Sequence, residues 1–98
     1  MIYTIVRFRV QPGKAPEFES GHRELVDFIG TQPGCAGIRV HRSLANPLEY
    51  VVYGTWDSKQ AWERAHQNKT FKQMFKSLPI VDHTLSGESF FELAYTAG

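Results

Sequence analysis

The segment Tyr50–Phe75, YVVYGTWDSKQAWERAHQNKTFKQMF, carries the pattern that decides the fold. Its first part belongs to the stretch Glu49–Trp56, which is rich in β-branched and aromatic residues and apolar on both faces. That stretch predicts a strand buried on both sides. Asp57 then has the position of a helix cap, with Gln60 as its reciprocal partner three residues later. Asn68 interrupts the helical pattern and is expected to cap a second helical piece. The segment therefore predicts a strand followed by two short helices.

Apolar residues recur at helical spacing in both of these pieces, and also in an earlier stretch from about Lys14 to Gly30. Spacings of three and four residues place side chains on one face of a helix. The earlier stretch therefore predicts a helix with an inward stripe of Phe18, His22, Leu25 and Ile29. The two later pieces have an inward face made of Ala61, Trp62, Ala65, Phe71, Met74, Phe75 and Leu78.

Other segments have the period-two alternation of β-strands. The predicted strands are Ile2–Val10, a stretch containing Ile38, Val40 and Leu44, then Glu49–Trp56, and a final strand at Glu88–Tyr95. The second and third strands are separated by the turn Ala45-Asn46-Pro47 and should form a hairpin. The order β-α-β-β-α-β predicts an α+β fold of the ferredoxin-like type with an antiparallel sheet.

The composition is that of an ordinary globular protein. The chain has 98 residues, with 11 Lys and Arg against 10 Asp and Glu, and it contains one cysteine. This predicts a single domain, residues 1–98. The balanced charge argues against a nucleic-acid or anionic-membrane partner, and no apolar run is long enough to span a membrane. A lone cysteine and the lack of a signal-peptide pattern favour a cytoplasmic protein.

One face of the predicted sheet should remain uncovered. Two helices can cover only one face of a four-stranded sheet. The other face would carry Tyr3, Ile5 and an aromatic residue of a later strand, either Tyr53 or Phe90. An exposed apolar patch of that size is usually an interface. The sequence therefore predicts a homodimer joined through the sheet faces, with twofold symmetry.

The motifs that bind nucleotide cofactors or metals are missing. The sequence contains no G-x-G-x-x-G, no G-x-x-x-x-G-K-[ST], no C-x-x-C and no H-E-x-x-H. The four histidines are scattered singly, whereas a zinc site normally needs three or four ligands, so no metal site is expected. Cys35 follows Pro-Gly and is expected to be a small structural residue, because a nucleophile would need an activating base nearby.

The candidate site is an aromatic helical layer with single polar residues inside it. His22 is either a hydrogen-bonded core residue or a general base that faces a pocket, since an ordinary histidine titrates near neutrality. His66 follows the inward Ala65 and lies either at the pocket edge or in solvent. The larger apolar residues either fill the core or line a flat cavity: Phe18, Trp56, Trp62, Phe71, Met74 and Phe75.

Several motifs, in chain order, resemble the antibiotic biosynthesis monooxygenase-like family. Members often show a strand ending in Trp, then an acidic or polar residue, Ser, an Ala-aromatic helix, a break and a Phe. Here these are Trp56, Asp57, Ser58, Ala61-Trp62, Asn68 and Phe71. The stretches VRFRVQPGKAPEFE (Val6–Glu19) and QPGCAGIRVHRSL (Gln32–Leu44) also resemble the family. The resemblance covers nearly the whole chain and implies a ferredoxin-like dimeric α+β barrel.

The resemblance implies a cofactor-independent monooxygenase that oxidises a phenolic, quinol or anthrone-type small molecule with O₂. A base, His22 or His66, would remove a proton, and the anion would pass an electron to O₂, so no cofactor is expected. Many quinol-oxidising relatives have a helix His nine residues after the Trp, a position that is Ala65 here and next to His66. The implied catalytic residues are His22, His66 and Trp56, and the implied substrate-binding residues are Phe18, Trp62, Phe71, Met74 and Phe75.

Other members of the family imply different functions. A non-catalytic, stress-associated dimer would bind a small molecule in the same cavity, and an isomerase of a small metabolite would work without oxygen. Haem-degrading relatives carry an Asn on the first strand and a ligand His in the second helical piece. These positions fall near Val6 and at Phe75, which argues against haem ligation.

Overall fold

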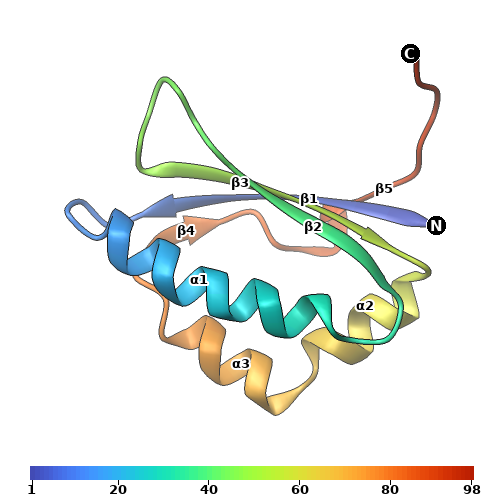
Figure 1. Cartoon of the computed structure of the whole chain (residues 1–98), viewed down its shortest axis with the longest axis horizontal. Coiled ribbons are helices and arrows are strands. Elements are labelled where there is room, and N and C mark those ends of the chain that lie inside the picture. The colour runs from blue at the N-terminus through green and yellow to red at the C-terminus, as the bar shows by residue number, and fades with distance from the viewer.

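Three α-helices lie on one side of a five-stranded sheet in the computed structural model, which describes residues 1–98 (Figure 1). The strands are β1 Ile2–Val10, β2 Cys35–Arg42, β3 Glu49–Trp56, β4 Ile80–His83 and β5 Phe90–Phe91. The helices are α1 Ala15–Gly30, α2 Lys59–His66 and α3 Lys69–Lys76, and a 3-10 turn, η1, covers Gly87–Ser89. None of the three α-helices has the length and apolar content that a membrane span requires.

The strands follow the order β2-β3-β1-β4, and each neighbouring pair is antiparallel. β1 and β3 form the central pair, in register from Ile2 opposite Trp56 to Arg9 opposite Glu49. β2 pairs with the other edge of β3, which forms the predicted hairpin. This arrangement confirms the predicted α+β, ferredoxin-like fold with an antiparallel sheet.

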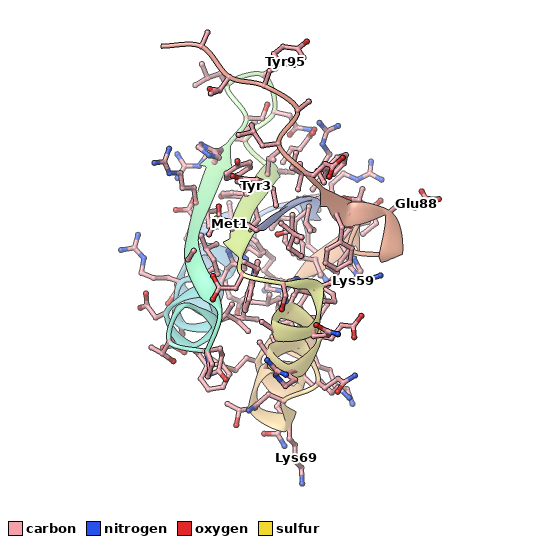
Figure 2. The ribbon with its side chains drawn as sticks, turned by 90° about the vertical axis from the view of Figure 1, so that its right-hand side faces the viewer. Met1, Tyr3, Lys59, Lys69, Glu88 and Tyr95 are labelled. Atoms are coloured by element: carbon pink, nitrogen blue, oxygen red, sulfur yellow. The ribbon has the colours of Figure 1, made fainter.

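The last strand differs from the predicted Glu88–Tyr95. β4 pairs with the C-terminal end of β1 and β5 with its N-terminal end, with η1 between them. Phe91 lies opposite Tyr3, so the residues that follow soon pass the start of β1 and have no strand to pair with. Leu93 and Tyr95 are therefore exposed. Figure 2 shows Tyr95 along an extended C-terminal segment, on the side of the sheet away from α2 and α3.

The predicted cap of α2, the pair Asp57 and Gln60, is wrong by one residue. Ser58 is the N-cap, and its Oγ accepts a hydrogen bond from the backbone N–H three residues later at 3.1 Å. Asp57 instead donates its own backbone N–H to the carbonyl oxygen of Gly34 at 2.8 Å, which ties the end of β3 to the loop before β2. Asn68 caps α3 as predicted and accepts hydrogen bonds from two backbone N–H groups.

The core lies between the sheet and α1. The predicted inward stripe of α1 is buried along its whole length, and it packs on the inward residues of β1. Phe18 is fully buried, with its ring centre 6.0 Å from that of Phe8 and 4.8 Å from that of Tyr50. Leu44, expected in the second strand, is instead fully exposed, because β2 ends at Arg42 and the chain turns there.

The face of the sheet away from the helices has no covering layer within the chain. Tyr3 and Tyr53 pack together on this face with ring centres 5.9 Å apart, and Ile5, opposite Tyr53, is 42% exposed. Phe90 lies on the helix side instead, edge-on to Trp62 at 4.7 Å. Of the two aromatic alternatives, Tyr53 is therefore the one on the open face. The predicted two-sided burial of β3 is incomplete in a single chain, because its outward residues are only half-buried.

Gly34 is required where α2 packs against the loop before β2. Its φ of +90° lies in the left-handed region, and a Cβ at this position would lie 2.4 Å from the Cβ of Ala61. We expect Gly34→Ala to lower the free energy of unfolding by about 2 to 4 kcal/mol, through backbone strain and overpacking together. Urea unfolding followed by circular dichroism measures this change.

Gly30→Ala is the matched control for this substitution. Gly30 is exposed at the end of α1, and a Cβ there would meet nothing within 4 Å. The control should leave the stability unchanged or raise it by less than about 1 kcal/mol, because Ala favours a helix over Gly. Equal stability of Gly34→Ala and the unmodified protein would contradict the packing described here.

Candidate functional site

A cavity of about 60 Å³ lies between the sheet and the helices. Its walls come from β1, β2, β3, all three α-helices and Leu85, which follows β4. Most of the lining side chains are apolar, and the polar ones include Thr4, His22 and His66. A concave, mostly apolar space with a few polar groups is the usual form of a small-molecule site.

His66 lies in an aromatic enclosure at the α2 side of the cavity. Its ring stacks on Trp62 with centres 4.0 Å apart, and the rings of Phe71 and Trp56 lie 4.5 and 5.8 Å away. Nδ1 of His66 lies 2.8 Å from the carbonyl oxygen of Trp62. A carbonyl oxygen can only accept, so Nδ1 carries the proton and Nε2 of the neutral ring keeps its lone pair.

The surroundings of His66 also favour its neutral form. Burial lowers the pKa of His66 below its ordinary 6.5, and the hydrogen bond to the Trp62 backbone offsets this only in part. At pH 7 the imidazole is therefore mostly uncharged, with Nε2 able to take up a proton.

His22 lies deeper, on α1, with only 4% of its surface exposed. It stacks on Phe18 with ring centres 4.8 Å apart, and the ring of Phe8 meets it edge-on at 5.4 Å. Burial lowers the pKa of His22 to about 4, so its ring is neutral at pH 7. The two ring nitrogens of His22 form no hydrogen bond within the chain. They are not fully enclosed, because every fully enclosed polar side-chain atom has a partner. His22 is therefore a buried residue that also lines the cavity.

Most of the site residues predicted from the sequence meet around this cavity. Those that line it are His22, Trp56, Trp62, His66, Phe71 and Phe75. Phe18 and Met74 do not. Phe18 lies behind His22 and faces a second hollow, while Met74 is half-buried and packs against the core. The predicted residues that meet at the cavity thus come from β3 and from all three helices.

The second hollow, of about 240 Å³, lies between α1 and the β2–β3 hairpin. Glu19 accepts hydrogen bonds there from the Tyr50 hydroxyl, at 2.5 Å, and from Arg42. The Tyr50 hydrogen bond, followed by that from Arg42, holds the pKa of the Glu19 carboxyl below its usual range. His22 borders this hollow as well as the central cavity and so forms part of the wall between them.

The lining residues that were not predicted from the sequence as part of the site include Thr4, Gly54 and Leu85. Thr4 is the one polar residue on the inward face of β1, and Gly54 is a glycine inside a strand. A polar residue on a buried face and a glycine within a strand are both signals of a close approach or a ligand. Leu85 follows β4, in a segment without a sequence pattern that predicts its position.

Residues that commonly bind metals are spread apart. His41 is exposed on β2, and His83, at the end of β4, packs against Phe75 and Phe8. Cys35 is half-buried at the start of β2. No three His, Cys, Asp or Glu side chains are close enough to hold a metal ion together.

The fold is shared with several solved structures. SnoaB from Streptomyces nogalater, a cofactor-independent oxygenase, is 24% identical, with 97% of this chain and 94% of that chain covered at a TM-score of 0.84. A conserved protein from Methanosarcina mazei is 19% identical, with 92% and 89% covered at 0.78. PA3566 from Pseudomonas aeruginosa is 18% identical, with 98% and 94% covered at 0.78. At these identities the likeness concerns the fold.

No curated protein matches the chain in sequence. The model of one protein family, antibiotic biosynthesis monooxygenase, matches residues 1–77. This match covers most of the chain, including all three α-helices and every cavity residue except Leu85. The chain therefore belongs to the antibiotic biosynthesis monooxygenase family.

Proposed function

We propose that this protein is a cofactor-independent monooxygenase that oxidises a phenolic, quinol or anthrone-type small molecule with O₂, with His66 as the general base. The observation that carries the proposal is the neutral His66 ring, whose Nδ1 donates to the Trp62 carbonyl oxygen beside an aromatic cavity. Family membership supports the class of reaction. The likeness to SnoaB, a cofactor-independent oxygenase, is consistent with it.

The reaction balances without a further reductant when the substrate has an activated CH₂ group, as in an anthrone. His66 removes a proton from this group or its enol form, and the resulting anion gives one electron to O₂. The radical and superoxide combine into a C–O bond, and the peroxide anion takes the proton back from His66. Loss of water then leaves a carbonyl, so one oxygen atom enters the product and the other leaves as water. The protein contributes proton transfer, orientation and a dry environment.

His66 is a better base than His22 near neutral pH. A general base works best when its pKa lies close to the working pH. The pKa of His22 is lowered to about 4 by burial, whereas the Trp62 hydrogen bond partly offsets the effect of burial on the pKa of His66. In this proposal His22 is a neutral part of the cavity wall that packs against the substrate.

Entry of the substrate requires side chains to move. A free volume of about 60 Å³ is far below the roughly 300 Å³ or more of a typical ligand pocket. Phe71, Phe75 and Leu85 separate this cavity from a wider groove of about 460 Å³ beside α3. Phe75 and Leu85 are only half-buried, so rotation of their side chains joins the two spaces. The combined space suits a flat aromatic molecule.

The proposal predicts oxygen uptake by metal-stripped protein with a panel of hydroquinones and anthrones. His66→Phe keeps an aromatic ring against Trp62 but removes the base, so we expect kcat to fall by about 10²- to 10⁴-fold. In the unmodified protein, kcat/KM should rise with pH to a plateau, with an apparent pKa below 6.5, because His66 acts when unprotonated. An oxygen electrode and product analysis measure both effects.

His41→Gln is the control, because His41 is exposed on β2 and does not line the cavity. It should retain full activity. Oxygen uptake that is unchanged in folded His66→Phe would exclude His66 as the base. Substrate turnover under nitrogen would favour an isomerase, and a ligand held unchanged in air would favour a non-catalytic binding protein.

The burial of His22 predicts a pH-dependent stability that can be measured without substrate. The pKa of His22 is about 4 when folded and about 6.5 when unfolded, so the unfolded state binds the proton more strongly. The part of the free energy of unfolding that depends on a neutral His22 is fully present above about pH 6.5. It is lost as the pH falls towards 4. Between pH 7 and pH 4.5 this loss should be about 2 to 3 kcal/mol.

The measurement compares urea unfolding at the two pH values for the unmodified protein and for His22→Gln. Between pH 7 and pH 4.5, His22→Gln should lose about 2 to 3 kcal/mol less of its free energy of unfolding than the unmodified protein. The other titrating groups are the same in both proteins and contribute equally. His41→Gln should lose as much as the unmodified protein. An identical pH dependence in the unmodified protein and His22→Gln would show that His22 is not buried as a neutral ring.

We also propose that the protein forms a homodimer through the open face of the sheet. Tyr3, Ile5 and Tyr53 provide a contiguous apolar surface there, which a second copy related by a twofold axis would cover. Ile5→Glu places a charge at the centre of this surface and should give monomers in light scattering. Leu44→Glu, the same kind of change on the fully exposed turn, should remain dimeric. A monomeric unmodified protein would contradict the proposal.

A further inference from the structure

The second hollow, between α1 and the β2–β3 hairpin, differs from the central cavity in size and in charge. Its volume is about 240 Å³, against about 60 Å³ for the central cavity. The apolar part of its wall includes Phe18, Val26 and Val40. Two arginines, Arg23 and Arg42, also line it, whereas no arginine or lysine lines the central cavity. The second hollow therefore suits a ligand with both an apolar part and a negative charge.

The guanidinium of Arg42 is held in place by tertiary contacts. Its Nε and Nη2 both donate to one carboxylate oxygen of Glu19, Oε2, at 3.1 and 2.5 Å. The Tyr50 hydroxyl donates to the same oxygen, and the Tyr50 ring lies 5.9 Å from the guanidinium carbon. These contacts leave Nη1 of Arg42 available to a ligand. Because the group is already fixed, a ligand that binds to it loses less conformational entropy.

The positive charge of the second hollow is only partly balanced within the chain. The pKa of the Glu19 carboxyl is held low first by the Tyr50 hydrogen bond and then by Arg42, with a weaker attraction from Arg23. Glu19 is therefore ionised at pH 7 and balances one guanidinium group. Arg23 takes part in none of the ion pairs of the chain. His22 is neutral, so one positive charge remains for a ligand to balance.

Val40 adds an apolar surface that the chain leaves uncovered. It lies on the helix-facing side of β2, opposite Val52, which lines the central cavity. Even so, 41% of the Val40 surface is exposed, because the second hollow separates it from α1. A ligand in the second hollow would remove this apolar surface from water. The volume of about 240 Å³ is slightly below the roughly 300 Å³ at which typical ligand pockets begin, so it suits a molecule with a single ring.

We infer that the second hollow is a binding site for a small carboxylate with an apolar body, such as a single-ring aromatic acid. Arg23 and Arg42 bind the carboxylate, since a guanidinium matches its two oxygens, while Val40 packs against the body. His22 and Val26 border both spaces and separate this site from the central cavity. The inference goes beyond the proposed function, because binding here requires no reaction with O₂.

Isothermal titration calorimetry with benzoate tests the site, with benzamide as the uncharged comparison ligand of the same shape. The unmodified protein should bind benzoate at least about tenfold more tightly than benzamide, because only benzoate balances the guanidinium charge. Arg23→Gln should weaken benzoate binding about tenfold, as for the loss of a hydrogen bond to a charged group. Its affinity for benzamide should change less than about twofold, because the apolar contacts remain.

Lys72→Gln is the matched control, because it removes one exposed positive charge from a helix beside the wider groove at α3. It has the same net charge as Arg23→Gln but should bind benzoate as tightly as the unmodified protein. Val40→Glu tests the site in a second way, by placing a carboxylate of the chain itself in the second hollow. It should abolish benzoate binding while circular dichroism shows a folded protein, since residue 40 is partly exposed.

NMR of the histidine rings locates the bound benzoate. The ring-proton signals of His22, which borders the second hollow, should shift on adding benzoate, whereas those of His66, which lines the central cavity, should not. Benzoate binding of equal strength in Arg23→Gln and the unmodified protein would overturn the inference. So would a shift at His66 alone, or an unmodified protein that does not bind benzoate. None of these results depends on oxygen uptake, so the site and the proposed oxygenase are tested separately.

Discussion

β1 and β3 pair in register from Ile2 opposite Trp56 to Arg9 opposite Glu49, at the centre of the sheet. Side chains alternate along each strand, so this register alone decides which of them face the helices. Thr4 and Gly54 lie together on the helix side, while Arg7 and its neighbours on the other face remain in contact with solvent. A shift of one residue would bring the arginines of β1 under α1, against the apolar side chains of Phe18, Leu25 and Ile29.

The helices complete the site by packing on this central pair. α1 brings the stacked rings of Phe18 and His22 over Phe8, and the break at Asn68 lets α2 and α3 both face the sheet. His66 therefore reaches the cavity from the end of α2, with its ring held by Trp62 and its Nδ1 proton held by a backbone carbonyl. The tautomer of His66 is thus set by the geometry of its own helix.

The cavity contains polar groups at places where apolar ones would give a more stable protein. A buried imidazole ring such as that of His22 lowers the stability at acidic pH, because the unfolded chain binds the proton more strongly. Natural proteins commonly accept such costs at sites that bind or transform a ligand. In this molecule these costs are concentrated in one small volume, whereas the rest of the core consists of aliphatic and aromatic packing.

Local patterns in the sequence determined the strands β1 to β3, the helical stripe of α1 and the cap at Asn68, because each depends on residues near one another in the chain. They also singled out both histidines that line the cavity and all of its aromatic residues except Phe8. Only the tertiary structure decided that Phe18 lies behind His22, that the last strand stops at Phe91 where β1 offers no further partner, and that Thr4 meets Trp56 above Gly54. These facts depend on strand register and on contacts between residues far apart in sequence, which no local periodicity encodes.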